Sequence, residues 1–112
     1  MIDSYKFGQI IIDGKKYISD LIIYPDHIDF KWWRKEGHTL KKEDLIDVIN
    51  YKPEVLIVGT GSPGLMKVTS LTKKYLESNN ISLIVQNTEK ACVTYNDFND
   101  KSNVVVALHL TC

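Results

Sequence analysis

The chain has 112 residues, about the size of one domain, and its 44% hydrophobic and 25% charged residues are typical of a folded rather than a disordered protein. Its 14 basic and 14 acidic residues cancel, so no strong field of one sign attracts it to nucleic acid or to an anionic membrane. The first residues lack the pattern of a signal peptide, and no stretch approaches the roughly 18 apolar residues of a membrane span. We therefore expect one cytoplasmic domain over residues 1–112, with neither nucleic acid nor a membrane as its partner.

The first third of the chain predicts antiparallel β-structure. Residues 7–12 form the first predicted strand, and the Asp13-Gly14 pair that follows is a strong hairpin signal. Residues 16–24 return as a second strand, and residues 28–33 form a third after a turn. This part of the molecule is therefore expected to be rich in β-hairpins.

The remaining two thirds predict strands that alternate with helices. A helix is expected after each of three capping residues, which are Thr39, Ser70 and Thr88. The predicted strands in this part are residues 55–58, 81–85 and 104–110. The strand at 55–58 is continuously apolar, as in strands whose two faces are both covered. This order predicts the α/β class, with a mixed sheet between helical or hairpin layers and about three helices.

A glycine-rich loop at residues 59–64 follows an apolar strand directly and matches the pattern G-x-G-x-x-G. In dinucleotide-binding proteins this pattern lets backbone amides approach a pyrophosphate. Here Pro63 removes one amide donor, and the next helix begins late, near Ser70. The following strand ends at Gln86 and Asn87, without the acidic residue that would bind a ribose. We therefore expect no nucleotide and no other cofactor.

Two interpretations of this loop remain open, namely a tight exit from the strand or a site for a small molecule or anion. If strands 55–58 and 81–85 are parallel neighbours, their carboxyl ends meet the start of the third helix in one crevice. The candidate ligand-binding residues of this crevice are Gly59, Thr60, Gly61, Ser62, Gly64, Asn87 and Thr88.

The segment WWRKEGH at residues 32–38 places two indoles next to each other on a predicted strand, so they point to opposite faces. One interpretation is an aromatic strand end with solvated charges. The other is an interaction surface made of Trp33, Arg34 and His38, because tryptophan and arginine are frequent interface anchors.

His109 lies in the last predicted strand among apolar residues. It is either a buried histidine with hydrogen-bonded ring nitrogens or a polar residue of a pocket, where it would need a polar partner to act as a base. The histidines are scattered, and Cys92 and Cys112 lack metal-ligand spacing, so no metal site is expected. Both cysteines are expected to be thiols in a reducing cytosol, unless the end of the chain folds back and joins them in a disulfide. No catalytic residue is identified.

Several segments together resemble a known family. They are Phe7-Gly8, Trp33-Arg34, Gly37-His38, residues 55–61 (VLIVGTG), residues 88–91 (TEKA), Tyr95-Asn96 and residues 109–112 (HLTC). Their order and spacing over nearly the whole chain are similar to those of the adipogenesis-associated Mth-domain-containing protein and of the mitochondrial complex I assembly factor three. The resemblance implies a three-layer α/β sandwich, and it implies no agreed activity, substrate, cofactor or catalytic residue. The assembly-factor role depends on partners and a targeting segment, so we do not transfer it.

The sequence therefore leads to two hypotheses on function. The first is a non-catalytic protein-interaction or assembly module, with a protein partner or a homodimer. The alternative is a small-molecule or anion binder, or an enzyme, that uses the crevice at the glycine-rich loop. The lack of a recognisable nucleophile, metal cluster or cofactor loop favours the first hypothesis over an enzyme.

Overall fold

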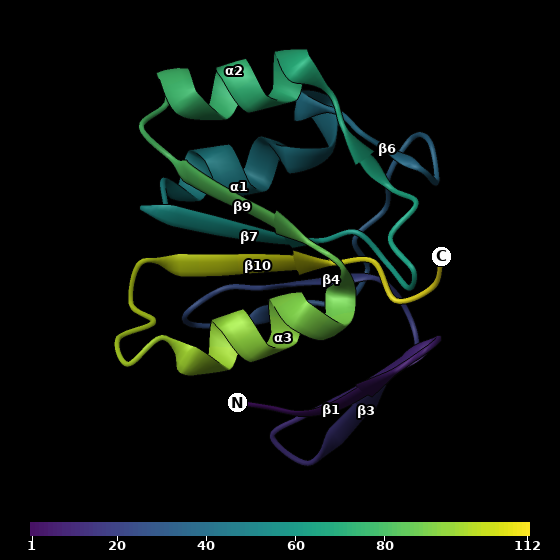
Figure 1. Ribbon diagram of the computed structural model, residues 1–112. Coiled ribbons are helices and arrows are strands. Elements are labelled where there is room, and N and C mark those ends of the chain that lie inside the picture. The colour runs from purple at the N-terminus through teal and green to yellow at the C-terminus, as the bar shows by residue number, and fades with distance from the viewer.

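The computed structural model describes residues 1–112 and arranges them in three layers around a five-stranded sheet (Figure 1). In spatial order the strands are β5 (Ile28–Asp29), β4 (Leu21–Ile23), β10 (Val104–Leu108), β7 (Val55–Gly59) and β9 (Ser82–Gln86). Strands β10, β7 and β9 are parallel to one another, whereas β4 and β5 are antiparallel to their neighbours. The sheet is therefore mixed, which confirms the predicted fold class.

Helices cover one face of this sheet, and a helix together with a small sheet covers the other (Figure 1). The first layer holds the 3-10 helix η1 (Lys42–Leu45), α1 (Ile46–Tyr51) and α2 (Ser70–Ser78). The second holds α3 (Thr88–Asp97) and the antiparallel strands β1 (Ile2–Lys6), β2 (Gln9–Ile12) and β3 (Lys15–Tyr17). A short parallel pair, β6 (Thr39–Leu40) and β8 (Lys67–Val68), lies beside the first layer. None of the helices is long and apolar enough to cross a membrane.

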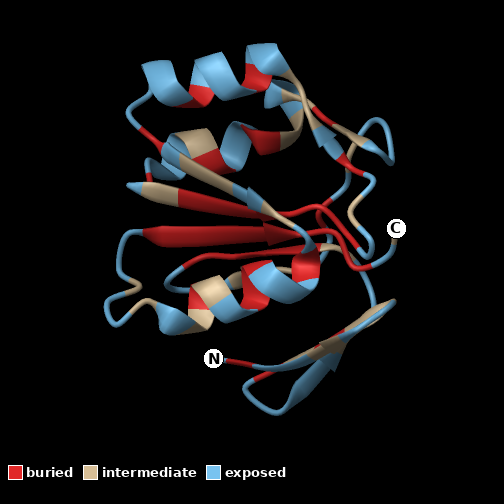
Figure 2. Cartoon of the chain, in the orientation of Figure 1, coloured by how far each residue is buried: buried red, intermediate tan, exposed pale blue.

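The core consists of two apolar clusters that lie on opposite faces of the central sheet. Strand β10 is buried over its whole length (Figure 2). Its side chains alternate between the two clusters. Val104, Val106 and Leu108 pack on the side of α3, while Val105 and Ala107 pack on the side of α1 and α2. A strand covered on both faces needs apolar residues at every position, which is why this segment lacks the polar alternation of a surface strand.

The first third of the chain differs from the sequence prediction in its strand boundaries. Strand β1 was missed, and the predicted strand 7–12 begins only at Gln9 because Gly8, at φ +83°, turns the chain between β1 and β2. The predicted strand 16–24 is divided into β3 and β4, which belong to different sheets. The predicted strand 28–33 is limited to Ile28 and Asp29, since Trp32 leaves the sheet and packs under the helical layer.

The helix starts also differ from the prediction by a few residues. Thr39 is not a helix cap but lies in β6, and the helical turn begins at Lys42. The side chains of Thr69 and Asn87 cap α2 and α3, because each accepts a hydrogen bond from a backbone N–H of the first turn. The last strand ends at Leu108, two residues earlier than predicted, so His109 lies just beyond the sheet.

Candidate functional site

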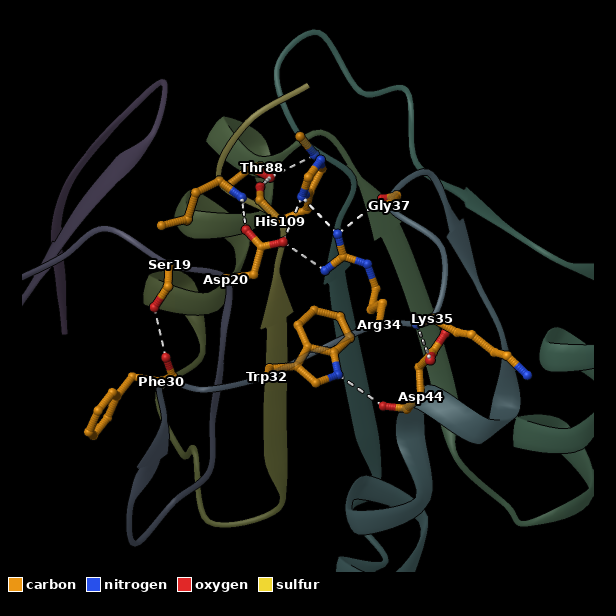
Figure 3. Close-up of polar contacts among 12 residues, drawn as sticks. Ser19, Asp20, Phe30, Trp32, Arg34, Lys35, Gly37, Asp44, Thr88 and His109 are labelled. Atoms are coloured by element: carbon orange, nitrogen blue, oxygen red, sulfur yellow. Dashed lines mark hydrogen bonds and ion pairs between the residues drawn. The ribbon is translucent and has the colours of Figure 1, made fainter.

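Four segments meet at one edge of the molecule because of the directions of the central strands. Strands β10, β7 and β9 all end here, in a register that sets Leu108 beside Gly59 and Gly59 beside Gln86. The antiparallel strand β4 begins here, since Leu21 is opposite Leu108. Residues that follow the three parallel strands therefore lie close to residues that precede β4 (Figure 3).

Asp20, Arg34 and His109, here called the Asp20 cluster, form a partly buried polar network at this edge (Figure 3). The Asp20 Oδ2 atom accepts hydrogen bonds from Arg34 Nη1 at 2.7 Å and from His109 Nδ1 at 2.8 Å. The Asp20 Oδ1 atom accepts a third from the backbone N–H of Leu110 at 2.8 Å. The side chains of Arg34 and His109 are only 5% and 7% exposed, so the two groups are paired inside the protein.

The environment of Asp20 keeps its carboxyl group ionised. Burial acts to raise the pKa, but the hydrogen bonds from His109, the Leu110 backbone and Arg34 outweigh it and lower the pKa to about 2. A folded-state pKa below the unfolded value means that the pairing stabilises the protein above about pH 4. This contribution is lost as the pH falls from there through the folded-state pKa of about 2.

The ionised carboxylate fixes the tautomer of His109. A carboxylate only accepts hydrogen bonds, so Nδ1 of His109 carries the proton and donates it to Asp20. The guanidinium of Arg34 has no acceptor, and its Nη2, 3.1 Å from the same Nδ1, donates instead to the Gly37 carbonyl at 3.0 Å. The other ring nitrogen, Nε2, is buried without a hydrogen-bond partner.

His109 is only 5% exposed, and neighbouring groups enclose its ring. The ring edge packs against Gly61, and the ring of His38 stands edge-on at 6.1 Å between centroids. The thiol Sγ of Cys112 is 3.8 Å from Nε2 of His38. An aspartate-histidine pair has the chemistry of a general base, but a base must reach the proton that it removes. In this geometry the Asp20 cluster joins strand ends rather than presenting a reactive group.

The seven residues predicted for the crevice lie at this edge, and the side chains of Thr60, Asn87 and Thr88 are hydrogen-bonded within the protein. The Thr88 hydroxyl donates to the His109 carbonyl at 2.6 Å and accepts from the Gly61 N–H at 2.8 Å. The Thr60 hydroxyl donates to the Gln86 carbonyl, and the Asn87 side chain caps α3. The binding of a ligand by these residues remains a prediction.

Residues 109–112 run along this loop and form backbone hydrogen bonds with it. The backbone N–H of Ser62 donates to the Thr111 carbonyl at 2.8 Å, and that of Leu65 donates to the Cys112 carbonyl at 3.0 Å. Gly61, at φ +102°, permits this approach, because a Cβ there would collide with the Thr111 carbonyl oxygen. The loop and the chain that follows β10 thus form one packed unit, with backbone meeting backbone.

The three residues predicted for an interaction surface have different environments. Trp33 is 76% exposed, and His38 is also exposed. Arg34, in contrast, is turned inward to Asp20, with its guanidinium carbon 4.8 Å from the ring centroid of Trp32. Trp32 is buried, and its indole N–H donates to the Asp44 carbonyl at 2.9 Å. Trp33 is therefore the member that offers a large apolar group to a partner.

Sequence reasoning missed Asp20, the centre of the network. The residue lies directly before the apolar strand β4, which is the only local signal. Its partner His109 is 89 positions away in the sequence, and the two meet only because β4 pairs antiparallel with β10.

Neither cysteine is part of a metal or disulfide site. No group of three or more histidine, cysteine, aspartate or glutamate side chains is placed to hold a metal ion. Cys92 and Cys112 are both free thiols in this structure. Burial in the core raises the pKa of Cys92 to about 12, so this thiol stays protonated and unreactive at neutral pH.

A strip of exposed apolar side chains runs across the helical layer, and we call it the helical face. Its members are Trp33, Ile46, Tyr75 and Leu71. Three open hollows, of about 330, 190 and 220 Å³, follow the strip from Trp33 past Ile46 and Tyr75 to Leu71. Glu43 lines all three hollows, so they form one continuous surface.

These features define the protein as a small α/β domain in which a partly buried aspartate joins the ends of a mixed sheet. The chain belongs to the family of proteins of unknown function DUF498/DUF598, whose model matches residues 2–109. This result confirms the family predicted from the sequence.

Solved structures of similar proteins agree with this assignment. A conserved hypothetical protein from Pyrococcus horikoshii is 28% identical, covers 100% of this chain and 99% of its own, and superposes with a TM-score of 0.84. A Bartonella henselae protein described as an outer membrane protein is 24% identical, with coverage of 99% and 94% and a TM-score of 0.84. A Bordetella pertussis protein described as an Mth938-like domain is 18% identical, with coverage of 98% and 85% and a TM-score of 0.76. At 24% and 18% identity, the likeness to the last two proteins shows a shared fold and nothing about function.

Proposed function

We propose that the protein is a non-catalytic interaction module that binds a protein partner through the helical face. The observation that carries this proposal is the exposure of Trp33, which is 76% open to solvent, next to Ile46, which is 57% open. Scattered single apolar residues are normal on a surface, but a continuous strip that includes a tryptophan is typical of an interaction site. Tryptophan is also among the residues that contribute most to binding energy.

The charges around Trp33 indicate the chemistry of the partner. The hollow beside Trp33 is lined by four acidic residues and one basic residue, namely Asp29, Glu43, Asp44, Asp47 and Lys31. Asp44 is engaged by backbone N–H groups of Lys35 and Lys41. The carboxylates of Glu43 and Asp47 have no backbone N–H partner of the sort that engages Asp44. Both residues border the apolar strip. The fitting partner is therefore a segment with apolar side chains flanked by lysine or arginine.

The Asp20 cluster supports the non-catalytic part of the proposal. His109 Nε2 is buried, and the edge of the His109 ring packs against Gly61, so the cluster offers no exposed base. We also propose the cytoplasm as the location, because two free thiols suit a reducing compartment.

A selection of random peptides on the intact protein tests the helical face. Enriched peptides are expected to combine a large apolar residue with lysine or arginine, because they must fill the Trp33 hollow and meet its acidic rim. Trp33→Ala should weaken their binding by about 30-fold, the effect of losing a central interface anchor. The measurement is the Kd of the enriched peptides by fluorescence anisotropy.

The matched control is Phe7→Ala, which removes an exposed aromatic ring from the turn between β1 and β2, away from the helical layer. It should leave the Kd unchanged. The proposal is wrong if no peptide is enriched, or if enriched peptides bind the Trp33→Ala protein as tightly as the unaltered one.

A second candidate is the binding of a small molecule at the crevice of residues 59–64. The observation in its favour is the buried Nε2 of His109 beside Gly61, which has no hydrogen-bond partner in the protein and would gain one from a ligand. A thermal-shift screen of metabolites and nucleotides should then find a compound that raises Tm, and His109→Gln should abolish the rise. A screen in which no compound raises Tm argues against this candidate.

A further inference from the structure

Strand β9 forms one edge of the central sheet and lacks the usual protection of an edge. It lies at the end of the strand order, next to β7, and Ser82 and Val85 are exposed (Figures 1 and 2). Its sequence, SLIVQ, contains no proline, no glycine and no charged residue, which are the features that normally prevent an edge from pairing. The opposite edge, β5, has only two residues, and one of them is Asp29.

The backbone of β9 has free hydrogen-bonding groups at defined positions. The Ser82 N–H donates to the Glu54 carbonyl at 2.8 Å, and the Gln86 carbonyl accepts from the Thr60 N–H at 2.9 Å, so both residues face the β7 side. Backbone groups of a strand alternate in direction, and Leu83 and Val85 therefore point their N–H and C=O groups outward. The edge thus offers two donors and two acceptors in a regular extended row.

We propose that β9 pairs antiparallel with β9 of a second copy of this chain, around a two-fold axis at Ile84. In this register Leu83 lies opposite Val85 of the second copy, and Val85 lies opposite its Leu83. All the outward backbone groups of the two strands are then bonded, whereas a shift by one residue leaves some of them without a partner. The two central sheets become one continuous sheet, and the unprotected edges disappear.

The side chains next to the edge are complementary to a second copy. Val85 is 41% exposed, and the pairing would cover it with the apolar Leu83 of the other copy. A hollow of about 830 Å³ lies beside β9, and its walls include Lys73 and Glu77 of α2 together with Leu83 and Val85. A two-fold axis perpendicular to the sheet sets the two α2 helices antiparallel across the junction.

Charge complementarity follows from this symmetry. Lys73 and Glu77 are one helical turn apart on α2, and both line the hollow beside β9. In the proposed dimer the antiparallel α2 helices bring Lys73 of each copy toward Glu77 of the other. If both residues carried charges of the same sign, the two copies would repel each other at this contact. The zero net charge of the chain adds no general repulsion between copies. This surface is separate from the Trp33 end of the helical face, so the dimer proposal stands or fails independently of the proposed function.

Measurements of the mass in solution test the pairing. Sedimentation equilibrium of the full chain should give twice the monomer mass, and Val85→Lys should give the monomer, because it places a charge at the buried junction. The control is Val93→Lys, which adds the same charge at a site on α3 that is 57% exposed, and which should remain dimeric. Circular dichroism shows that each variant is folded.

A charge exchange makes the test specific for this register. Lys73→Glu alone and Glu77→Lys alone should each weaken the dimer by about tenfold or more, because each sets like charges against one another. The double variant Lys73→Glu with Glu77→Lys should restore the dimer, since the exchanged charges again face their opposites. Amide hydrogen exchange should show Leu83 and Val85 protected in the dimer and unprotected in Val85→Lys.

Three results would overturn the proposal. The first is a chain that remains a monomer at about 0.5 mM, far above the Kd of a stable interface of standard size. The second is a dimer that Val85→Lys leaves intact, which would show that another face is used. The third is a double charge variant that is no more dimeric than the single ones.

Discussion

Replacement of Gly61 by alanine is expected to lower the free energy of unfolding by about 3 kcal/mol or more, because two separate costs act at this position. The backbone φ of +102° is unfavourable for any residue with a side chain. In addition, the new Cβ would meet the Thr111 carbonyl oxygen and would lie 2.9 Å from both the Cys112 carbonyl oxygen and Cδ2 of His109. Backbone atoms cannot move aside as the tip of a flexible side chain can.

Gly14→Ala is the matched control for this change. Gly14 also has a positive φ, of +79°, but nothing lies within 4 Å of the position that its new Cβ would take. Gly14→Ala should therefore lower the free energy of unfolding by only about 1 kcal/mol, which is the cost of the left-handed conformation alone. Urea unfolding of the unaltered protein, of Gly61→Ala and of Gly14→Ala gives both differences in the free energy of unfolding. Equal losses for the two alanine variants would show that residues 109–112 do not pack tightly against the loop.

Asp20→Ala is expected to lower the free energy of unfolding by about 3–5 kcal/mol, as in other proteins that lose one partner of a buried ion pair. The change leaves the guanidinium of Arg34 without its carboxylate, although the side chain is only 5% exposed. It also removes the partners of His109 Nδ1 and of the Leu110 N–H. Unfolding in urea, followed by tryptophan fluorescence, measures the loss.

An exposed ion pair provides the control for Asp20. Lys41 and Glu36 are 3.1 Å apart, and both side chains are at least one-third exposed, so Glu36→Ala should cost less than about 1 kcal/mol. The pH dependence supplies a second readout, because Asp20→Asn keeps the shape of the side chain and removes its titration. The stability difference between Asp20→Asn and the unaltered protein should shrink by about 1–2 kcal/mol between about pH 5 and pH 2. A difference that stays constant over this range would contradict the low pKa of Asp20.

The parts of the fold that the sequence predicted well are those whose signal is local. Strands β7 and β10 are continuous apolar runs, and such runs identify covered strands without knowledge of their neighbours. The end of α2 also has a local signal, because Asn80 takes the left-handed conformation, at φ +60°, that asparagine tolerates. The N-terminal strands were less predictable, since β3, β4 and β5 have only two or three residues each, too few for a clear alternation.

The candidate site was predictable only in part, for a related reason. The meeting of Gly59 with Thr88 follows from the parallel order of β7 and β9, and this convergence was inferred from the sequence. The packing of Thr111 against Ser62 uses backbone groups, which leave no trace in residue type. The pairing of Asp20 with His109 depends on which strand neighbours β10, a long-range choice that no local pattern encodes.

The central position of β10 has a consequence for how the molecule is made. It is the last strand in the sequence, yet it lies between β4 and β7 and bonds to both. During translation these two strands therefore leave the ribosome with no neighbour between them, and their unsatisfied edges are open to wrong pairing. The sheet closes only after residues 104–108 have been synthesised, so the domain must acquire its native structure late and in one cooperative step.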